Sequence, residues 1–265
     1  MSHLKWDNLK LDVASDSLAG PHRRTNEDSV LAKAPVFIVA DGMGGHDAGD
    51  LASALVVEQL AKLPTDPTIE GVQEVFHQTR SLIDALPGRR GQYAAGTTVS
   101  GVILIDQGGQ PYWLVINLGD SRTYRLTDGQ VTQVSVDHSE VQAMIDAGQL
   151  TPEGARSHQR RNVVTRILGA GTDEVPDYWL IPVAAKERWM VCSDGVTAEL
   201  PQTVIESIVA AGDSPTNTVT ALVTSALAAG GHDNISVIVL DSRREDEEIT
   251  APTWEASAPS WSQTV

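Results

Sequence analysis

Short apolar runs rich in valine and isoleucine recur along the chain, and each is bounded by glycine, aspartate or proline. Runs of this length and composition are typical of β-strands that contribute to a folded core. The pattern predicts at least seven strands, over residues 29–34, 36–41, 97–106, 112–120, 122–135, 188–194 and 234–241.

Between these runs lie amphipathic stretches with helical spacing, several of them opened by Asp, Ser or Pro. The turn signals IDQGGQPYW and RLTDGQVT join neighbouring strands directly, which favours antiparallel pairing over strand–helix–strand units. Antiparallel sheets that are covered by helices form a layered α/β sandwich. The predicted helices are residues 48–63, 68–86, 138–147, 201–211 and 215–229.

The composition of the chain changes after Asp241. Residues 242–265 are first charged and acidic, and then rich in Ser, Pro, Ala and Thr. Such a segment has too few apolar residues to form a core of its own. We therefore expect one domain, residues 1–241, followed by an acidic, mobile C-terminal tail, residues 242–265.

Charge and composition narrow the classes of partner. The chain has 35 acidic and 19 basic residues, a formal charge of −16, which argues against nucleic acid or an anionic membrane and favours a cationic ligand. A single cysteine, Cys192, excludes an internal disulfide and a cysteine-rich zinc site. No segment approaches the roughly 18 consecutive apolar residues of a membrane span. Because the N-terminus also lacks the pattern of a signal peptide, we expect a cytoplasmic protein.

Four aspartates stand at the ends of predicted strands. Asp41, Asp120 and Asp194 each follow an apolar run, and Asp233 precedes one. Aspartate is also a common turn residue, and for each position taken alone a turn is the simpler interpretation. Asp41 and Asp194, however, lead toward predicted helices rather than into hairpins. Carboxylates gathered at adjacent strand ends repel one another unless a cation neutralises them, and oxygen ligands without His or Cys select Mg²⁺ or Mn²⁺.

The residues around Asp41 extend this interpretation. The glycines of DGMGG let the backbone approach a metal ion, so that the Gly42 carbonyl is available as an oxygen ligand. Upstream, Arg23 lies close in sequence to the acidic pair Glu27 and Asp28. An exposed basic residue is the alternative for Arg23, but a guanidinium beside a metal–carboxylate site is well suited to bind phosphate.

Seven motifs occur in one order along the chain: RRTNED, VADGMGG, AAGTT, NLGDSR, DHS, SDGV and GGHDNISV. In this respect the sequence resembles the metal-dependent protein phosphatases of type 2C, in their compact bacterial branch, over about residues 14–241. The resemblance implies two central, mainly antiparallel β-sheets flanked by α-helices on both sides. It also implies a centre of two Mn²⁺ or Mg²⁺ ions and hydrolysis of phosphoserine and phosphothreonine in proteins.

The resemblance implies the ligands of the two core ions. Asp41 would bridge both ions, Gly42 would give its carbonyl to one of them, and Asp194 and Asp233 would hold the other. A hydroxide that bridges the two ions would attack phosphorus directly, so that no phosphoenzyme forms.

Further roles follow from the same resemblance. Glu27 and Asp28 would act mainly through coordinated waters. Asp120 would hold a third ion together with Asp194, and Arg23 matches the phosphate-binding arginine of the family. The sequence itself assigns none of these roles.

Two positions leave part of the chemistry open. His158 lies in the segment that corresponds to the flap of the family and would meet substrate there, although a surface histidine is an equal alternative. Met43 stands where the animal members carry a histidine. Because a thioether cannot donate a proton, the general acid is not identified.

The leading hypothesis is a monomeric protein phosphatase whose substrates are the phosphoprotein targets of a serine/threonine kinase. One alternative is a catalytically silent module that binds phosphoproteins or regulates a partner. A second alternative is a hydrolase of small phosphoesters that uses the same centre. The presence of all four strand-end aspartates disfavours the silent module, whereas comparison of phosphopeptides with small metabolites would separate the two hydrolases.

Overall fold

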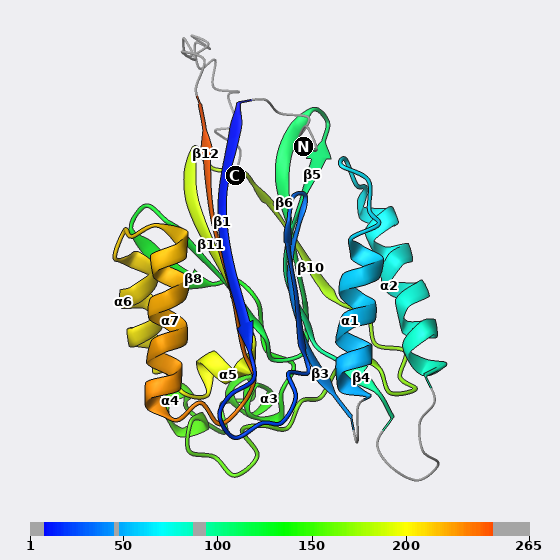
Figure 1. Cartoon of the computed structure of the whole chain (residues 1–265), viewed down its shortest axis with the longest axis vertical. Helices are drawn as coiled ribbons and strands as arrows, with labels where there is room; N and C mark the ends of the chain where they lie inside the picture. The colour runs from blue at the N-terminus through cyan, green and yellow to red at the C-terminus, as the bar shows by residue number, and fades with distance from the viewer. Residues whose placement is uncertain (1–7, 45–47, 87–93, 246–265) are drawn as a thin grey trace, which may run out of the picture.

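The chain is seen in a computed structural model, which describes residues 8–44, 48–86 and 94–245. Two antiparallel β-sheets stack face to face, and helices cover the outer face of each sheet (Figure 1). The predicted layered α/β sandwich, with two central antiparallel sheets and helices on both sides, is confirmed.

The first sheet has five strands in the order β1–β12–β11–β7–β8, and each neighbouring pair is antiparallel. Two helices, α6 (Gln202–Ala210) and α7 (Pro215–Ala229), cover its outer face through a cluster of buried apolar side chains. The strands are β1 (Leu9–Leu18), β7 (Arg122–Thr127), β8 (Gln130–Gln133), β11 (Lys186–Cys192) and β12 (Ile235–Arg244).

The second sheet runs in the order β10–β6–β5–β3–β4–β9, and β2 pairs with β3. Its outer face is covered by α1 (Gly49–Leu60) and α2 (Ile69–Asp84), again through a buried apolar cluster. The strands are β2 (Asp28–Lys33), β3 (Val36–Met43), β4 (Gly96–Thr97), β5 (Val99–Gln107), β6 (Gln110–Leu118), β9 (Leu168–Gly169) and β10 (Asp177–Pro182).

Large apolar side chains fill the space between the two sheets. Trp113 of β6 packs edge-on against Phe37 of β3 and against Trp189 of β11, with ring centroids 6.2 and 6.1 Å apart. Strands such as β3, β5 and β12 are buried on both faces, which is why their sequences are nearly continuous apolar runs. This core fixes one sheet on the other and therefore fixes the relative positions of their strand ends.

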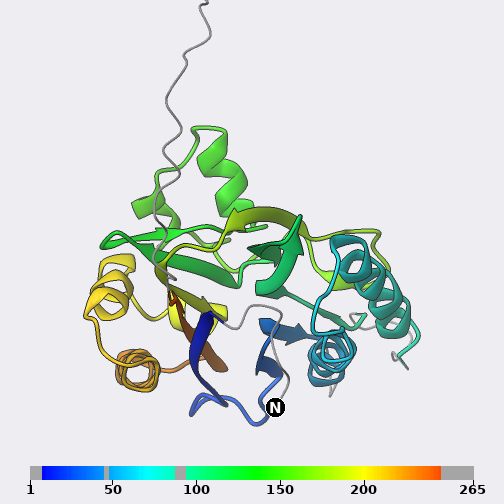
Figure 2. The ribbon, with the colours of Figure 1, turned by 90° about the horizontal axis from the view of Figure 1, so that it is seen from above.

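Three short helices lie at the end of the sandwich where β3, β6 and β11 finish, which is the lower end in Figure 1. They are α3 (Glu140–Asp146), α4 (Pro152–Ala155) and α5 (Asp194–Thr197). The hydroxyls of Ser139 and Thr151 accept the backbone N–H groups that open α3 and α4. Figure 2 shows the green α3–α4 segment standing out from the two sheets.

The five predicted helices are confirmed, with ends that differ by only a few residues. The sequence pattern predicts neither β1 nor β10, because both are edge strands whose side chains are mostly exposed or half-buried. Their apolar signal is therefore weak. Within the described residues, none of the helices has the length and apolar character needed to cross a membrane.

Strand β12 continues beyond the expected end of the domain. It runs to Arg244, and Ser242 within it is fully buried. Residues 242–244 are therefore part of the sheet, and a boundary after Asp241 cuts through a strand. The rest of the expected tail, residues 246–265, lies outside the described residues, so its mobility stays a prediction.

Truncation should distinguish the two boundaries. Removal of residues 246–265 is expected to leave the melting temperature unchanged, because β12 stays intact. Removal of residues 242–265 deletes the last three residues of β12, which pair with β1, and should lower the melting temperature by several degrees. Thermal melts of the two truncated chains beside the full chain measure this, and equal melting temperatures would contradict the extended boundary.

Candidate active site

The fold brings five aspartates to one end of the sandwich. Asp28 of β2 and Asp41 of β3 are direct cross-strand neighbours. Asp120 follows β6, Asp194 begins α5 immediately after β11, and Asp233 comes just before β12. These positions all lie at the lower end in Figure 1, so acids from both sheets gather in one region.

Two threonines hold the end of β3 in place. The backbone N–H of Asp41 donates to the Thr98 hydroxyl (3.1 Å), and the Asp41 carbonyl accepts from the Thr98 N–H (2.8 Å) and the Thr97 hydroxyl (2.9 Å). The Thr98 hydroxyl also bonds the hydroxyl of Ser121, which follows Asp120 (2.7 Å). The AAGTT motif thus fixes the backbone of Asp41 and ties it to the loop that carries Asp120.

A second set of contacts fixes the loop before β2. The Asn234 side chain accepts from the Glu27 N–H (2.9 Å) and donates to the Thr25 carbonyl (2.9 Å). The Glu27 carbonyl in turn accepts from the Gly42 N–H (3.1 Å) and from the Ser53 hydroxyl (2.6 Å). Hydrogen bonds to backbone groups therefore hold three distant motifs of the sequence together, namely RRTNED, VADGMGG and GGHDNISV.

Burial and mutual repulsion raise the pKa values of the clustered carboxyl groups. Desolvation is the main cause at Asp28, whose pKa rises to about 6, and the charges of Asp194 and Asp233 add to the rise. Desolvation likewise raises the pKa of Asp194 to about 6, followed in effect by the charge of Asp233. The pKa values of Asp41 and Asp120 are raised well above the ordinary range, again by desolvation first and then by neighbouring aspartates. A bound cation would relieve this repulsion.

Several carboxylate oxygens in the cluster lack hydrogen-bond donors. Both oxygens of Asp28 and Oδ1 of Asp194 are buried without a partner among the described residues. The hydroxyls of Ser193 and Ser236 lie close enough to Asp28 to offset part of the rise in its pKa, but neither forms a well-aligned hydrogen bond to it. Buried oxygens without donors are costly unless a cation takes them as ligands. By charge and by chemistry, the cluster fits hard divalent cations.

The side chains do not form a finished ligand cage. In the part of the chain that the structure describes, no three Asp, Glu, His or Cys side chains converge closely enough to hold one ion. Arg23 accounts for part of this, because its Nη2 donates to Asp233 Oδ2 at 2.5 Å. The Asp41 and Asp194 carboxyl groups lie close enough to interact. The contact with Arg23 would have to give way for Asp233 to act as a ligand.

The pKa of Asp28 predicts a pH dependence of stability. Because the folded chain binds this proton more tightly than the unfolded chain, Asp28 reduces the stability of chelator-treated protein as the pH rises from about 4 to about 6. Asp28→Asn removes this loss. The difference in free energy of unfolding between the variant and wild type should therefore shift in favour of the variant by on the order of 2 kcal/mol as the pH rises through this range. Urea unfolding of both chains across this pH range measures the gain, and a difference that is constant with pH would count against the raised pKa.

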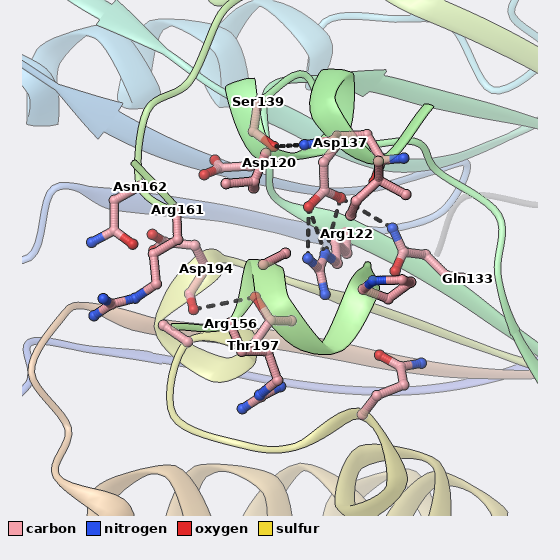
Figure 3. A pocket seen from close by; sticks show the side chains of 17 residues that line it. Asp120, Arg122, Gln133, Asp137, Ser139, Arg156, Arg161, Asn162, Asp194 and Thr197 are labelled. Carbon is pink, nitrogen blue, oxygen red and sulfur yellow. Dashed lines mark hydrogen bonds and ion pairs between the residues drawn. The ribbon is translucent and has the colours of Figure 1, made fainter. Parts of the chain in front are cut away.

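A cavity of about 380 Å³ opens beside the cluster, and Asp120 and Asp194 form part of its wall. Figure 3 shows Arg122 in this wall, paired with Asp137 through Nε (2.9 Å) and Nη2 (2.6 Å). The other lining residues come from β8, from α3, α4 and α5, from the start of α6 and from the segments beside them. The cavity thus connects the aspartate cluster with the α3–α4 segment.

His138 supports the loop that precedes Asp120. Its backbone N–H donates to the Gly119 carbonyl (2.8 Å), and its ring Nδ1 accepts from the Gly119 N–H (3.1 Å). The Nε2 atom of the same buried ring bonds Asp177 of β10 (3.0 Å). The DHS motif therefore fixes the backbone beside Asp120.

His158 lies apart from the cluster. It follows α4, and its Nδ1 accepts from the backbone N–H of Arg160 (3.2 Å). It is not among the side chains that line the cavity. Its contact with substrate stays a prediction.

Sequence comparison identifies relatives of the chain, although no family model matches it. It is 36% identical to the serine/threonine protein phosphatase PstP of Mycobacterium tuberculosis over 254 residues, covering 92% of this chain and 47% of that protein. It is 32% identical to the protein phosphatase PhpP of Streptococcus pneumoniae over 252 residues, covering 91% of this chain and all of that protein. The chain belongs to the bacterial serine/threonine protein phosphatases. The chain spans about half the length of its mycobacterial relative.

Solved structures agree with this assignment. The crystal structure of the M. tuberculosis phosphatase PstP/Ppp matches this chain with a TM-score of 0.79 at 33% identity, covering 87% of this chain and 98% of that one. The catalytic domain of PstP in complex with two manganese ions matches with a TM-score of 0.76 at 32% identity, covering 89% and 99%. The resemblance to the metal-dependent family is thereby confirmed for the fold and the family.

Some residues that shape the site have no assigned role in the sequence analysis. Thr97, Thr98 and Asn234 act through backbone contacts, and although they lie within the AAGTT and GGHDNISV motifs, their residue types do not indicate which backbone groups they bind. Arg156 and Arg161 line the cavity, yet their sequence context resembles any exposed basic stretch. Only the fold brings them near the aspartates.

Proposed function

We propose that the phosphatase hydrolyses phosphoserine and phosphothreonine in proteins, with Mn²⁺ or Mg²⁺ bound at the aspartate cluster. The observation that carries the proposal is the gathering of carboxylates from both sheets, with buried oxygens that lack donors and pKa values raised by desolvation and by mutual repulsion. The names of the relatives support the reaction, and the manganese complex of PstP supports the class of metal.

The residues that would hold two core ions are Asp41, Gly42 through its carbonyl, Asp194 and Asp233. Glu27 and Asp28 would contribute mainly through waters, and a third ion would lie at Asp120 and Asp194. When bound, such ions acidify water to supply a nucleophile near neutral pH and neutralise charge on the phosphoryl oxygens. The acidic residues themselves exclude other anions from the site until the cations are present.

Arg23 is proposed to bind the phosphate group of the substrate. Its guanidinium lies at the edge of the cluster and is partly exposed, with Asp233 as its carboxylate partner in the structure. A phosphate offers the same pair of acceptors with more charge. Arg23 would therefore exchange Asp233 for the substrate and leave that aspartate to a cation.

Arg23→Ala tests this exchange. The KM of the variant for a phosphothreonine peptide should be about tenfold higher, because the variant lacks a charge-assisted hydrogen bond to phosphate. Its affinity for Mn²⁺ should not fall, because removal of a nearby positive charge and of the contact to Asp233 favours a cation. Kinetics combined with calorimetric titration measure both quantities. Equal weakening of substrate and metal binding would contradict the proposed role.

The reaction itself is tested with chelator-treated protein to which Mn²⁺ or Mg²⁺ is returned. Phosphothreonine and phosphoserine peptides should be hydrolysed only with metal, and far faster than small phosphorylated metabolites. A preference for the metabolites would favour the small-phosphoester hydrolase. Tight phosphopeptide binding without hydrolysis would favour the silent binding module.

Three further points stay predictions: that a serine/threonine kinase produces the substrates, that the protein is a monomer, and that it is located in the cytoplasm.

A further inference from the structure

The cavity beside the aspartate cluster contains positive charge that the chain does not neutralise. Three arginines line it, and Arg122 among them is fully engaged with Asp137. Arg156 makes one hydrogen bond from its guanidinium, to the Leu200 carbonyl at 3.3 Å. The Arg161 guanidinium has no ion pair or hydrogen bond with any residue that the structure describes.

Five of the twelve arginines that the structure describes lack an ion pair, and the other three, Arg24, Arg243 and Arg244, do not line the cavity. The chain has a formal charge of −16, so carboxylates are plentiful. The arginines that form an ion pair with a described carboxylate are Arg23, Arg80, Arg122, Arg125, Arg160, Arg166 and Arg188. Two arginines without such a partner nevertheless line the same cavity.

The acids in the cavity wall do not balance these two arginines. Asp137 is committed to Arg122. Asp120 and Asp194 are, under the proposed function, committed to metal ions. The remaining polar wall is neutral, as Figure 3 shows for Gln133, Ser139 and Asn162. With metal bound, the cavity would present only positive charge to a ligand.

We propose that this cavity, through Arg156 and Arg161, binds a second anionic group on the substrate peptide, next to the phosphorylated residue. Because Asp194 belongs both to the cluster and to the cavity wall, a peptide whose phosphate is at the cluster places its neighbouring residues at the cavity. An extended chain advances about 3.3–3.6 Å per residue, so the second group lies within the first few residues on one side. A carboxylate and a second phosphoryl group both match a guanidinium fork.

The inference rests on the proposed function, and one kinetic experiment separates the two. The probes are phosphothreonine peptides in which each position from one to three residues away carries Ala, Glu or a non-hydrolysable phosphonate analogue of phosphoserine. Wild type should show a KM about tenfold lower for an anionic group at one position, with the phosphonate stronger than Glu. The preference should shrink as salt is added, because both arginines are exposed.

The double variant Arg156→Gln/Arg161→Gln should lose the preference, so that its KM values for the Ala and Glu peptides become equal. Arg243→Gln/Arg244→Gln is the matched control, since it removes the same two charges near the opposite end of β12 and should keep the full preference. A preference that survives in the double variant, or is absent from wild type, overturns the inference.

A KM that the double substitution raises by the same factor for every peptide also overturns the inference, because the arginines would then bind the reacting phosphate. No hydrolysis of any peptide with Mn²⁺ would instead refute the proposed function.

Discussion

Asp41→Asn is expected to reduce hydrolysis of a phosphothreonine peptide by at least about a hundredfold. Loss of a residue that merely hydrogen-bonds a metal ligand can already reduce activity by about a hundredfold, and Asp41 is proposed to be a ligand itself. The substitution keeps the size of the side chain and removes its charge. Asp41 lies close to the other aspartates of the cluster. Desolvation is the largest cause of its raised pKa, and the charges of four aspartates add to the rise, namely Asp28, Asp194, Asp120 and Asp233. Steady-state kinetics at saturating Mn²⁺ measure the loss.

The same variant has a second expected result that a misfolded protein would not show. In chelator, Asp41→Asn should melt at a higher temperature than wild type, because an amide relieves the desolvation and repulsion of the buried carboxyl group. With Mn²⁺ added, wild type should gain stability through ligand binding and the variant should gain much less. Melting temperatures that keep the same order with and without Mn²⁺ would contradict the role of Asp41 as a ligand.

Gly42→Ala is expected to destabilise the fold by about 1–3 kcal/mol or more, which is the usual effect of overpacking. A Cβ at this position would lie 2.0 Å from the Gly49 carbonyl oxygen and 2.6 Å from the Glu27 carbonyl oxygen. Both contacts are with backbone, so neither neighbour can rotate away. Urea unfolding of the chelator-treated chain measures the change.

The matched control for Gly42 is Gly71→Ala in the first turn of α2. Its Cβ would meet only the Thr68 hydroxyl, at 3.2 Å, and alanine favours a helix. This control should stay within about 0.5 kcal/mol of wild type. If Gly42→Ala were equally mild, the close packing of β3 against the start of α1 would not be what requires a glycine.

Gly42 shows where sequence reasoning succeeds and where it stops. The sequence assigns the glycine to close backbone approach and names a metal ion as the neighbour. The structure shows the Gly42 backbone close to the backbone of Gly49 and Glu27, which leaves no room for a side chain, while the approach to a metal ion is not tested. The carbonyl ligand stays a prediction.

The fold could be predicted where a segment buries apolar side chains at a regular spacing. This holds for the helices α1, α2 and α7 and for the buried strands β3, β5 and β12. It fails for the edge strands β1 and β10, and for β4 and β9, which are only two residues long and exist because of their partners. Pairing across a fold leaves no local signal.

The candidate site could be predicted as a set of acids but not as a geometry. The aspartates stand out because each adjoins an apolar strand. The ion pair of Arg23 with Asp233 joins residues 210 positions apart, and no local pattern indicates it. The same is true of the cavity between the cluster and the α3–α4 segment, with Arg156 and Arg161 in its wall.

The central claim is that the aspartate cluster holds the cations on which phosphoprotein hydrolysis depends. Its most direct test is calorimetric titration of chelator-treated protein with Mn²⁺, with phosphothreonine-peptide hydrolysis measured in the same samples. We predict that wild type binds at least two ions per chain, that hydrolysis appears as they bind, and that Asp41→Asn loses both. Full hydrolysis by the chelator-treated protein, or undiminished Mn²⁺ binding by Asp41→Asn, would contradict the account.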